Sequence, residues 1–222
     1  MRRVVIVGGG LGGLTAAALL AHAGYDVTVL EKNGRTGGKA GSWTAGGFTF
    51  DTGPTLLTMP FVLEEVFSLL GEDPKNHLPL TQLDPVSRCF FPDGTRLDVT
   101  SGREEMEARV EAFAPGEGRA YVRFMRRAER IYRAASDAFM FSAFGSEGAR
   151  GLLRAVRLLP SVTRLDAFRT LHQAVRGEFR DTRLVRLFDR FATYAGASPF
   201  LAPATLAVIA HVELTMGGWY PA

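Results

Sequence analysis

The chain has 222 residues, of which 46% are hydrophobic, 22% charged and 10% aromatic, and its formal net charge is +3. This composition is typical of a globular protein with a sizeable core and excludes general disorder. The single cysteine, Cys89, excludes an internal disulfide framework, and it shows no metal-ligand spacing with His22, His77, His172 or His211.

The first residues resemble the start of a signal peptide, because Arg2 and Arg3 precede the apolar stretch VVIVGGGLGG (residues 4–13). Five of the six residues 8–13 are glycine, however, and glycine is costly inside a helix because it loses so much backbone entropy. No small-residue cleavage site follows, since residues 25–30 are again strand-like. We therefore expect neither a signal peptide nor a membrane anchor here.

A β-α-β unit is the alternative that accounts for this stretch. The β-branched run Arg3–Val7 is typical of a central parallel strand that is covered on both faces. The Ala- and Leu-rich residues 14–23 predict a helix, and Asp26–Leu30 predicts a second strand. The unit is the beginning of a Rossmann-like fold.

The turn between the predicted strand and helix carries a dinucleotide-binding fingerprint. Gly8, Gly10 and Gly13 form G-x-G-x-x-G, in which the glycines allow a tight turn, close approach of a pyrophosphate and close packing of helix on strand. Glu31 follows the second strand and can accept hydrogen bonds from an adenosine ribose. The helix N-terminus adds N–H donors and a positive dipole end. A glycine turn that binds nothing is the alternative.

The residues after Glu31 bear on which dinucleotide is bound, because the fingerprint does not separate NAD from FAD. Residues 31–40 read EKNGRTGGKA, a second glycine-rich loop in which Arg35 and Lys39 can reach phosphates. An exposed polar turn is the alternative for this loop.

Three stretches together resemble a known family: EKNGRTGGKAGSW (residues 31–43), GFTFDTGPTLLT (47–58) and YAGASPFLAPATLAVIAHVELTMGGWYP (194–221). They are similar to carotenoid desaturases of the bacterial phytoene desaturase (phytoene dehydrogenase) type, which belong to the flavin amine oxidase-like superfamily. The resemblance implies that FAD is the cofactor. By position it implies these FAD-binding residues: Gly8, Gly10, Leu11, Gly12, Gly13, Glu31, Lys32, Arg35, Gly38, Lys39, Ala40, Asp51, Thr52, Gly53, Pro54 and Thr55.

The chain after residue 58 is predicted to be a helix, a hairpin and then mostly helices. Residues 60–70 predict a helix, and residues 88–100 predict a hairpin that turns at Pro92-Asp93-Gly94. Ser101 and Glu104 predict a capping box for the next helix. From residue 118 onward the pattern is helical, with breaks at 145–151, Pro160 and Gly177.

The predicted fold class is therefore α/β, with a Rossmann-like FAD-binding βαβ unit and hairpin insertions in residues 1–100. Residues 101–222 are expected to form a mainly helical region, which the resemblance implies to be substrate-binding and membrane-facing. The sheet is expected to be incomplete, because the resemblance implies a later return to the flavin domain. We expect an N-terminal fragment or a truncated reading frame that binds FAD weakly or not at all when purified alone.

The charge is unevenly distributed along the chain. Residues 119–190 hold 16 of the 26 Lys and Arg but only 7 of the 23 Asp and Glu, which indicates an anionic partner or a solvated helix face. Residues 139–165 combine apolar and Arg side chains, as interfacial segments do. Leucines that face the core are the alternative. The resemblance favours peripheral membrane association in the cytoplasm, and no motif accompanies the basic run to favour nucleic acid.

The resemblance implies FAD-dependent desaturation of phytoene, neurosporene or a hydroxylated or later acyclic carotenoid. Phe188, Phe191 and Tyr194 can line a polyene tunnel or belong to the core. No catalytic base is identified, although Arg154 and Arg169 can take part. The alternatives are another flavin oxidoreductase (an amine oxidase or a retinol-saturase-like enzyme) and a non-catalytic lipid-binding relative like the GDP-dissociation inhibitors.

Overall fold

The computed structural model describes residues 2–136 and 165–221, which form two compact units. The N-terminal unit comprises Met1–Leu83 and Gly218–Ala222, and the helical unit comprises Asp84–Gly217. The division therefore lies between Leu83 and Asp84, whereas the sequence analysis places it between residues 100 and 101. The reason is that the hairpin of residues 87–99 packs on the helices, with Leu97 and Val99 buried in their core.

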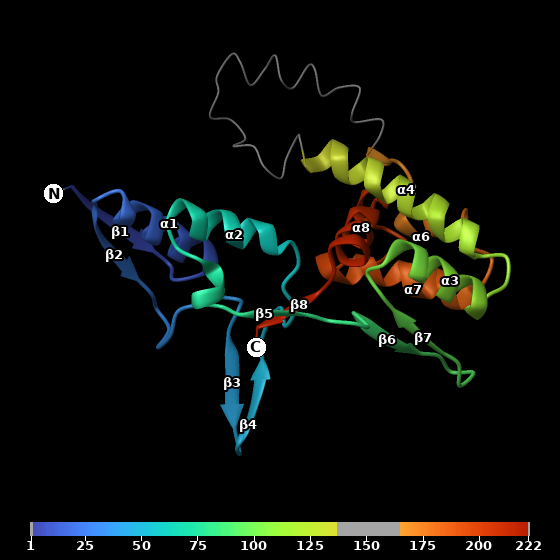
Figure 1. The fold of residues 1–222 in the computed structure, drawn as a ribbon, viewed down its shortest axis with the longest axis horizontal. Coiled ribbons are helices and arrows are strands. Elements are labelled where there is room, and N and C mark those ends of the chain that lie inside the picture. Colours follow the sequence, from blue (N-terminus) through green and yellow to red (C-terminus); the bar gives the residue numbers. More distant parts are fainter. Residues whose placement is uncertain (1, 137–164, 222) are drawn as a thin grey trace, which may run out of the picture. The chain divides into compact units, whose positions relative to one another are not determined.

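The N-terminal unit begins with the expected β-α-β arrangement (Figure 1). Strand β1 (Arg3–Val7) is followed by helix α1 (Leu11–His22) and strand β2 (Asp26–Leu30). The strands are parallel and in register from Arg3 opposite Asp26 to Val7 opposite Leu30. The helix begins at Leu11, three residues earlier than the sequence pattern predicts. Leu11, Gly12 and Gly13 of the G-x-G-x-x-G fingerprint therefore lie in its first turn.

Strand β1 is not covered on both faces in the described part of the chain, and that expectation is wrong there. Val4 and Ile6 are half-buried, whereas Val5 and Val7 are 59% and 85% exposed. The physical reason is that helix α1 packs on the two-stranded sheet of β1 and β2 and covers one of its faces. An apolar strand alone therefore does not identify its covering layers.

The rest of the N-terminal unit contains two strand pairs and one α-helix. One of the hairpin insertions expected in residues 1–100 is present at residues 42–51, and the helix predicted from residue 60 is confirmed. Residues 219–221 form a strand that pairs with residues 80–82. The elements are β3 (Ser42–Ala45), β4 (Phe48–Asp51), α2 (Pro60–Leu69), a 3₁₀ turn (Pro74–Asn76), β5 (Leu80–Gln82) and β8 (Trp219–Pro221).

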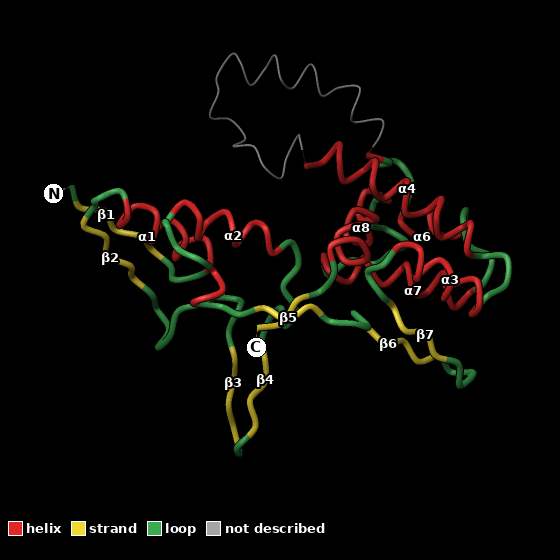
Figure 2. The backbone as a smooth tube through the Cα atoms, in the orientation of Figure 1, coloured by secondary structure: helices red, strands yellow, loops and turns green. Residues whose placement is uncertain are grey.

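The helical unit consists of one hairpin and several packed helices (Figure 2). The hairpin predicted around residues 92–94 is confirmed as an antiparallel pair. The described elements are β6 (Ser87–Phe90), β7 (Arg96–Val99), α3 (Arg103–Phe113), α4 (Gly118–Ala135), α6 (Leu171–Arg176), α7 (Thr182–Asp189), α8 (Ala207–Met216) and 3₁₀ turns at Arg190–Ala195 and Ala204–Leu206.

The core of the helical unit is aromatic. Helix α4 buries side chains spaced three or four residues apart, including Tyr121 and Phe124, as an amphipathic helix does. Phe188 contacts Phe124 and Phe179, with ring centroids 4.8 and 4.6 Å away, and those two rings are 5.7 Å apart. Phe188 and Phe191 are fully or almost fully buried, so these two residues belong to the packed core.

Two of the helices are capped by their own sequence. Thr170 and Gln173 form a reciprocal capping box at α6, and the Asp181 side chain accepts the Arg183 N–H at α7. The capping box expected at Ser101 and Glu104 is not formed. Helix α3 begins at Arg103 with Gly102 as its N-cap, so the serine stands one residue too early to cap the helix.

Some expectations fall on residues outside the described ranges. These are Arg154, the breaks at 145–151 and Pro160, and the basic apolar stretch 139–165 except for its last residue. Among the described residues, no helix is both long and apolar enough to cross a bilayer.

Candidate functional site

The glycine-rich turn joins β1 to an uncapped helix. Gly8 has a φ of +102°, which side-chain-bearing residues rarely adopt, and its N–H donates to the Leu30 carbonyl at 2.7 Å. Helix α1 starts after Gly10, and no side chain caps it. The first N–H groups of a helix have no partner within it, so this turn presents free donors at a positive dipole end.

The glycines of the turn differ in what surrounds them. A Cβ at Gly13 would lie 2.1 Å from the Gly8 carbonyl oxygen, so the packing of α1 on the turn requires glycine there. A Cβ at Gly10 would meet its nearest atom, the Gly38 Cα, at 4.0 Å, and one at Gly12 would meet nothing within 4 Å. Packing within the chain therefore does not require these two glycines, and open space lies beside the free donors.

Glu31 is hydrogen-bonded to the glycine-rich turn. Its Oε2 accepts the Gly9 N–H at 2.7 Å, and its Oε1 accepts the backbone and side-chain N–H groups of Asn33 at 2.9 and 2.8 Å. The backbone hydrogen bonds from Asn33 and Gly9 hold the pKa of the Glu31 carboxyl below its ordinary value. Each carboxylate oxygen accepts about two hydrogen bonds, so Oε2 keeps one acceptor site for a ligand hydroxyl.

The second glycine-rich loop lies directly against the first. The Gly37 N–H donates to the Gly9 carbonyl at 2.7 Å, and Gly10 and Gly37 form a parallel bridge. A Cβ at Gly38 would lie 3.0 Å from the Gly10 Cα. The close backbone contact therefore favours glycine at residue 38, whereas residue 10 has room for a Cβ.

The segment after β4 lies against the second loop. The Thr52 N–H donates to the Gly41 carbonyl at 2.9 Å, and a Cβ at Gly53 would lie 1.8 Å from the Lys39 carbonyl oxygen. The structure thus brings together three segments in which the resemblance implies FAD-binding residues: residues 8–13, 31–40 and 51–55. Arg35 donates to the Ser42 hydroxyl at 3.0 Å, while Leu11, Lys32, Asp51, Pro54 and Thr55 are exposed.

Sequence reasoning misses Asn33 and Gly9 as members of the site. Their contacts are between backbone groups or with the Glu31 carboxylate, so no side-chain chemistry marks them in advance. The available signal was the spacing of Asn33 two residues after an acid, since such short polar side chains readily bond nearby groups.

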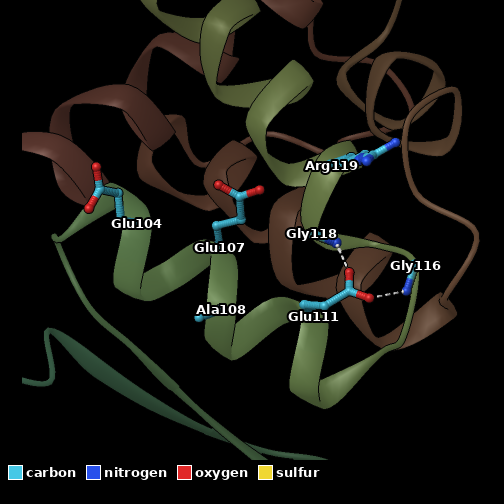
Figure 3. A pocket seen from close by; sticks show the side chains of 7 residues that line it. All are labelled: Glu104, Glu107, Ala108, Glu111, Gly116, Gly118 and Arg119. Carbon is cyan, nitrogen blue, oxygen red and sulfur yellow. Dashed lines mark hydrogen bonds between the residues drawn. The ribbon is translucent and has the colours of Figure 1, made fainter.

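A hollow of about 690 Å³ lies on the helical unit, and three glutamates are among its seven lining residues (Figure 3). The Glu111 carboxylate there accepts the Gly116 and Gly118 N–H groups at 2.8 and 2.9 Å, while Arg119 points away from it. These bonds hold the pKa of Glu111 below its ordinary value and close the turn between α3 and α4. The hydrogen bonds of Glu111 therefore belong to the structure of this turn, and we do not assign the hollow as a ligand site. Across residues 2–136 and 165–221, no cluster of metal-binding side chains is found.

Acidification is expected to destabilise the helical unit through Glu111. Its folded-state pKa is lowered, so its stabilising contribution is complete above the ordinary pKa of 4.5 and is lost as the pH falls through the folded value. The variant Glu111→Gln should show a smaller loss of Tm between neutral pH and pH values below 4.5 than the unmodified chain. Glu104→Gln in the same hollow is the control, and an equal pH dependence of Glu111→Gln and the unmodified chain would contradict the assignment.

Ion pairs in the helical unit hold several of the remaining polar side chains. The buried Glu213 carboxylate binds the Arg190 guanidinium and the Tyr194 hydroxyl. Burial, followed by this hydrogen bond, raises the pKa of Tyr194 to about 12. Arg169 binds Asp166, and His172 Nδ1 lies 2.7 Å from an Asp189 carboxylate oxygen.

The chain was compared with known proteins. A family model described as flavin containing amine oxidoreductase matches residues 11–218. A 4,4'-diapolycopene oxygenase of a Methylomonas species is 34% identical over 99% of this chain and 44% of its own length. A Streptomyces griseus phytoene dehydrogenase is 40% identical over 98% of this chain and 42% of its own. A putrescine oxidase variant shares the fold, with a TM-score of 0.56 at 18% identity over 99% of this chain and 45% of its own. The chain spans less than half the length of these relatives.

Proposed function

Because the chain belongs to the family of flavin containing amine oxidoreductases, we propose that its N-terminal unit binds FAD for the desaturation of a carotenoid. The observation that carries the proposal is the backbone contact between the two glycine-rich loops at Gly10 and Gly37, which we call the clasp. Glu31 lies beside it and binds the Gly9 N–H. The carotenoid substrate is supported by relatives named as phytoene dehydrogenase and carotenoid 3,4-desaturase.

The residues of the clasp fit the two halves of an ADP group. The uncapped start of α1, with open space at Gly10 and Gly12, suits a pyrophosphate. The free acceptor site on Glu31 Oε2 suits a ribose hydroxyl. We assign Leu11, Gly13, Gly38, Lys39 and Ala40 to the same phosphate side.

The remaining assigned residues extend the site in both directions. Lys32 lies beside Glu31, and Arg35 is held by Ser42 at the start of β3. The segment from Asp51 through Thr52, Gly53, Pro54 and Thr55 is assigned to the isoalloxazine side, because its Gly53 lies against Lys39.

When bound, FAD supplies an acceptor for a hydride from an allylic C–H of the polyene. The polyene itself stabilises developing positive charge, so the chain contributes binding, orientation and exclusion of water. We therefore assign no catalytic base. The substrate is a hydrocarbon that partitions into lipid, and the proposal includes peripheral association with a membrane.

Oxygenation is the second candidate, because several relatives are named as 4,4'-diapolycopene or 4,4'-diaponeurosporene oxygenases. The two reactions are separated by their products, since desaturation removes two hydrogen atoms and oxygenation adds oxygen. Both are detected by mass spectrometry of the extracted carotenoid.

The test uses residues 1–222 joined to the part of the Streptomyces griseus enzyme that lies beyond its match, with the chain alone in parallel. Incubation with FAD and liposomal phytoene, neurosporene or lycopene should give red-shifted carotenoid absorbance. A chimera that contains stoichiometric flavin and changes none of these carotenoids would refute the substrate assignment.

Glu31→Gln is expected to weaken FAD binding to the chimera about tenfold, because it replaces a charged acceptor of the ribose and the Gly9 N–H. The change is measured by quenching of flavin fluorescence. Glu64→Gln on the exposed face of α2 is the control and should bind FAD like the unmodified chimera. Equal affinity of Glu31→Gln and the control would remove Glu31 from the site.

A further inference from the structure

Helix α4 carries a line of exposed arginines, which we call the α4 stripe: Arg119, Arg123, Arg126, Arg130 and Arg133. Their spacing of three and four residues places them on one side of an α-helix. The opposite side buries Tyr121, Phe124 and Ile131 in the core of the helical unit. The line covers about 21 Å along the helix axis, at about 1.5 Å per residue.

The stripe is only partly neutralised. Arg123 lies 3.0 Å from Glu178, which also pairs with Arg127, and Arg133 lies 2.6 Å from Glu129. Arg119, Arg126 and Arg130 have no ion pair among the residues that the structure describes. The stripe therefore retains a strong positive charge.

Apart from Arg133, which pairs with Glu129 one turn earlier, the stripe does not stabilise the helix. Arg119 and Arg123, and likewise Arg126 and Arg130, are like charges four residues apart, which destabilise a helix. The core face of α4 needs none of these side chains. The charge of Arg119, Arg126 and Arg130 is therefore available to an external anionic partner.

We propose that the α4 stripe docks the protein on the anionic phospholipid headgroups of a membrane surface. Guanidinium groups bind phosphate oxygens bidentately, and a straight line of them suits a flat array of phosphates. The choice of a bilayer rests on the proposed function, because a carotenoid must be drawn from lipid. Nucleic acid also presents phosphates, but the stripe has no exposed aromatic ring on which bases would stack.

The test is sedimentation of the 222-residue chain with vesicles of phosphatidylcholine alone or with about one-third phosphatidylglycerol. The chain should bind the anionic vesicles and be released by salt. Because each arginine near such a surface contributes about fivefold in affinity, Arg126→Gln with Arg130→Gln should weaken binding about 25-fold.

Two further double variants serve as controls. Arg126→Lys with Arg130→Lys should retain most of the binding, since the charge remains. Arg96→Gln with Arg186→Gln removes two exposed arginines of the same unit outside α4 and should weaken binding far less. Circular dichroism and Tm establish that every variant is folded.

Equal binding of the two glutamine double variants, or equal binding to neutral and anionic vesicles, would overturn the proposal. So would tighter binding of the chain to a DNA or RNA duplex that displaces the vesicles, which would make nucleic acid the partner. The vesicle assay needs no catalysis. Vesicle binding by the chain, together with no carotenoid conversion by the flavin-loaded chimera, would therefore leave the α4 stripe in place and remove the proposed substrate.

Discussion

Gly13→Ala is expected to destabilise the N-terminal unit by about 3 kcal/mol, at the upper end of the range for overpacking. The added Cβ would lie 2.1 Å from the Gly8 carbonyl oxygen and 3.5 Å from the Ile6 Cγ2. The first of these contacts is with backbone, which a rotamer change cannot relieve. Helix α1 must therefore move away from β1, and the turn that presents the free donors is distorted.

The neighbouring Gly12→Ala is the matched control for this change. Its Cβ meets nothing within 4 Å, and alanine favours a helix over glycine, so this variant should be as stable as the unmodified chain or slightly more stable. Amide hydrogen exchange of β1 and α1 measures both variants. Equal protection in the two would show that α1 does not pack on the turn as described. In the chimera, Gly12→Ala should still reduce FAD binding, because the open space at residue 12 is assigned to the pyrophosphate.

Glu117→Ala is expected to lower the free energy of unfolding of the helical unit by about 3 kcal/mol, from two hydrogen bonds to a charged acceptor. The side chain is 7% exposed, and its Oε1 accepts the Arg180 and Asp181 N–H groups at 2.7 and 2.9 Å. Alanine leaves both donors without this acceptor. The turn before α4 then loses its bond to the turn before α7.

The variant Glu117→Gln keeps a hydrogen-bond acceptor at this position and removes the negative charge. The amide oxygen can still receive both N–H groups, so this variant should lose clearly less stability than Glu117→Ala. Glu107→Ala on α3, whose carboxylate makes no described hydrogen bond, should change stability by less than about 0.5 kcal/mol. Urea unfolding followed by circular dichroism measures all three. Similar midpoints for Glu117→Ala and Glu107→Ala would contradict the role assigned to Glu117.

The sequence predicts the parts of the site that are local along the chain. The spacing of Gly8, Gly10 and Gly13 predicts the turn, and Glu31 follows β2 as expected. Such local features are predictable because backbone sterics act over a few residues. The clasp between Gly10 and Gly37 is not predictable in this way, since it depends on how the second loop folds back.

Long-range contacts account for what the sequence does not show in the helical unit. Glu117 and Arg180 are 63 residues apart, and nothing in either local pattern pairs them. Phe188 has the same spacing pattern whether it lines a tunnel or a core, and only its contacts with Phe124 and Phe179 decide between the two. The exposed side of β1 is unpredictable for the same reason, because the elements that cover the faces of a strand come from other parts of the chain.

The pairing of β5 with β8 determines how the helical unit is attached. The Leu83 N–H donates to the Gly218 carbonyl at 2.9 Å, so the helical unit begins and ends at adjacent points of the N-terminal unit. A segment attached in this way is a topological insertion, which can be lengthened, shortened or exchanged without breaking the strands that carry it. The inserted helical unit can then vary in length and sequence while the strands β5 and β8 that carry it stay the same.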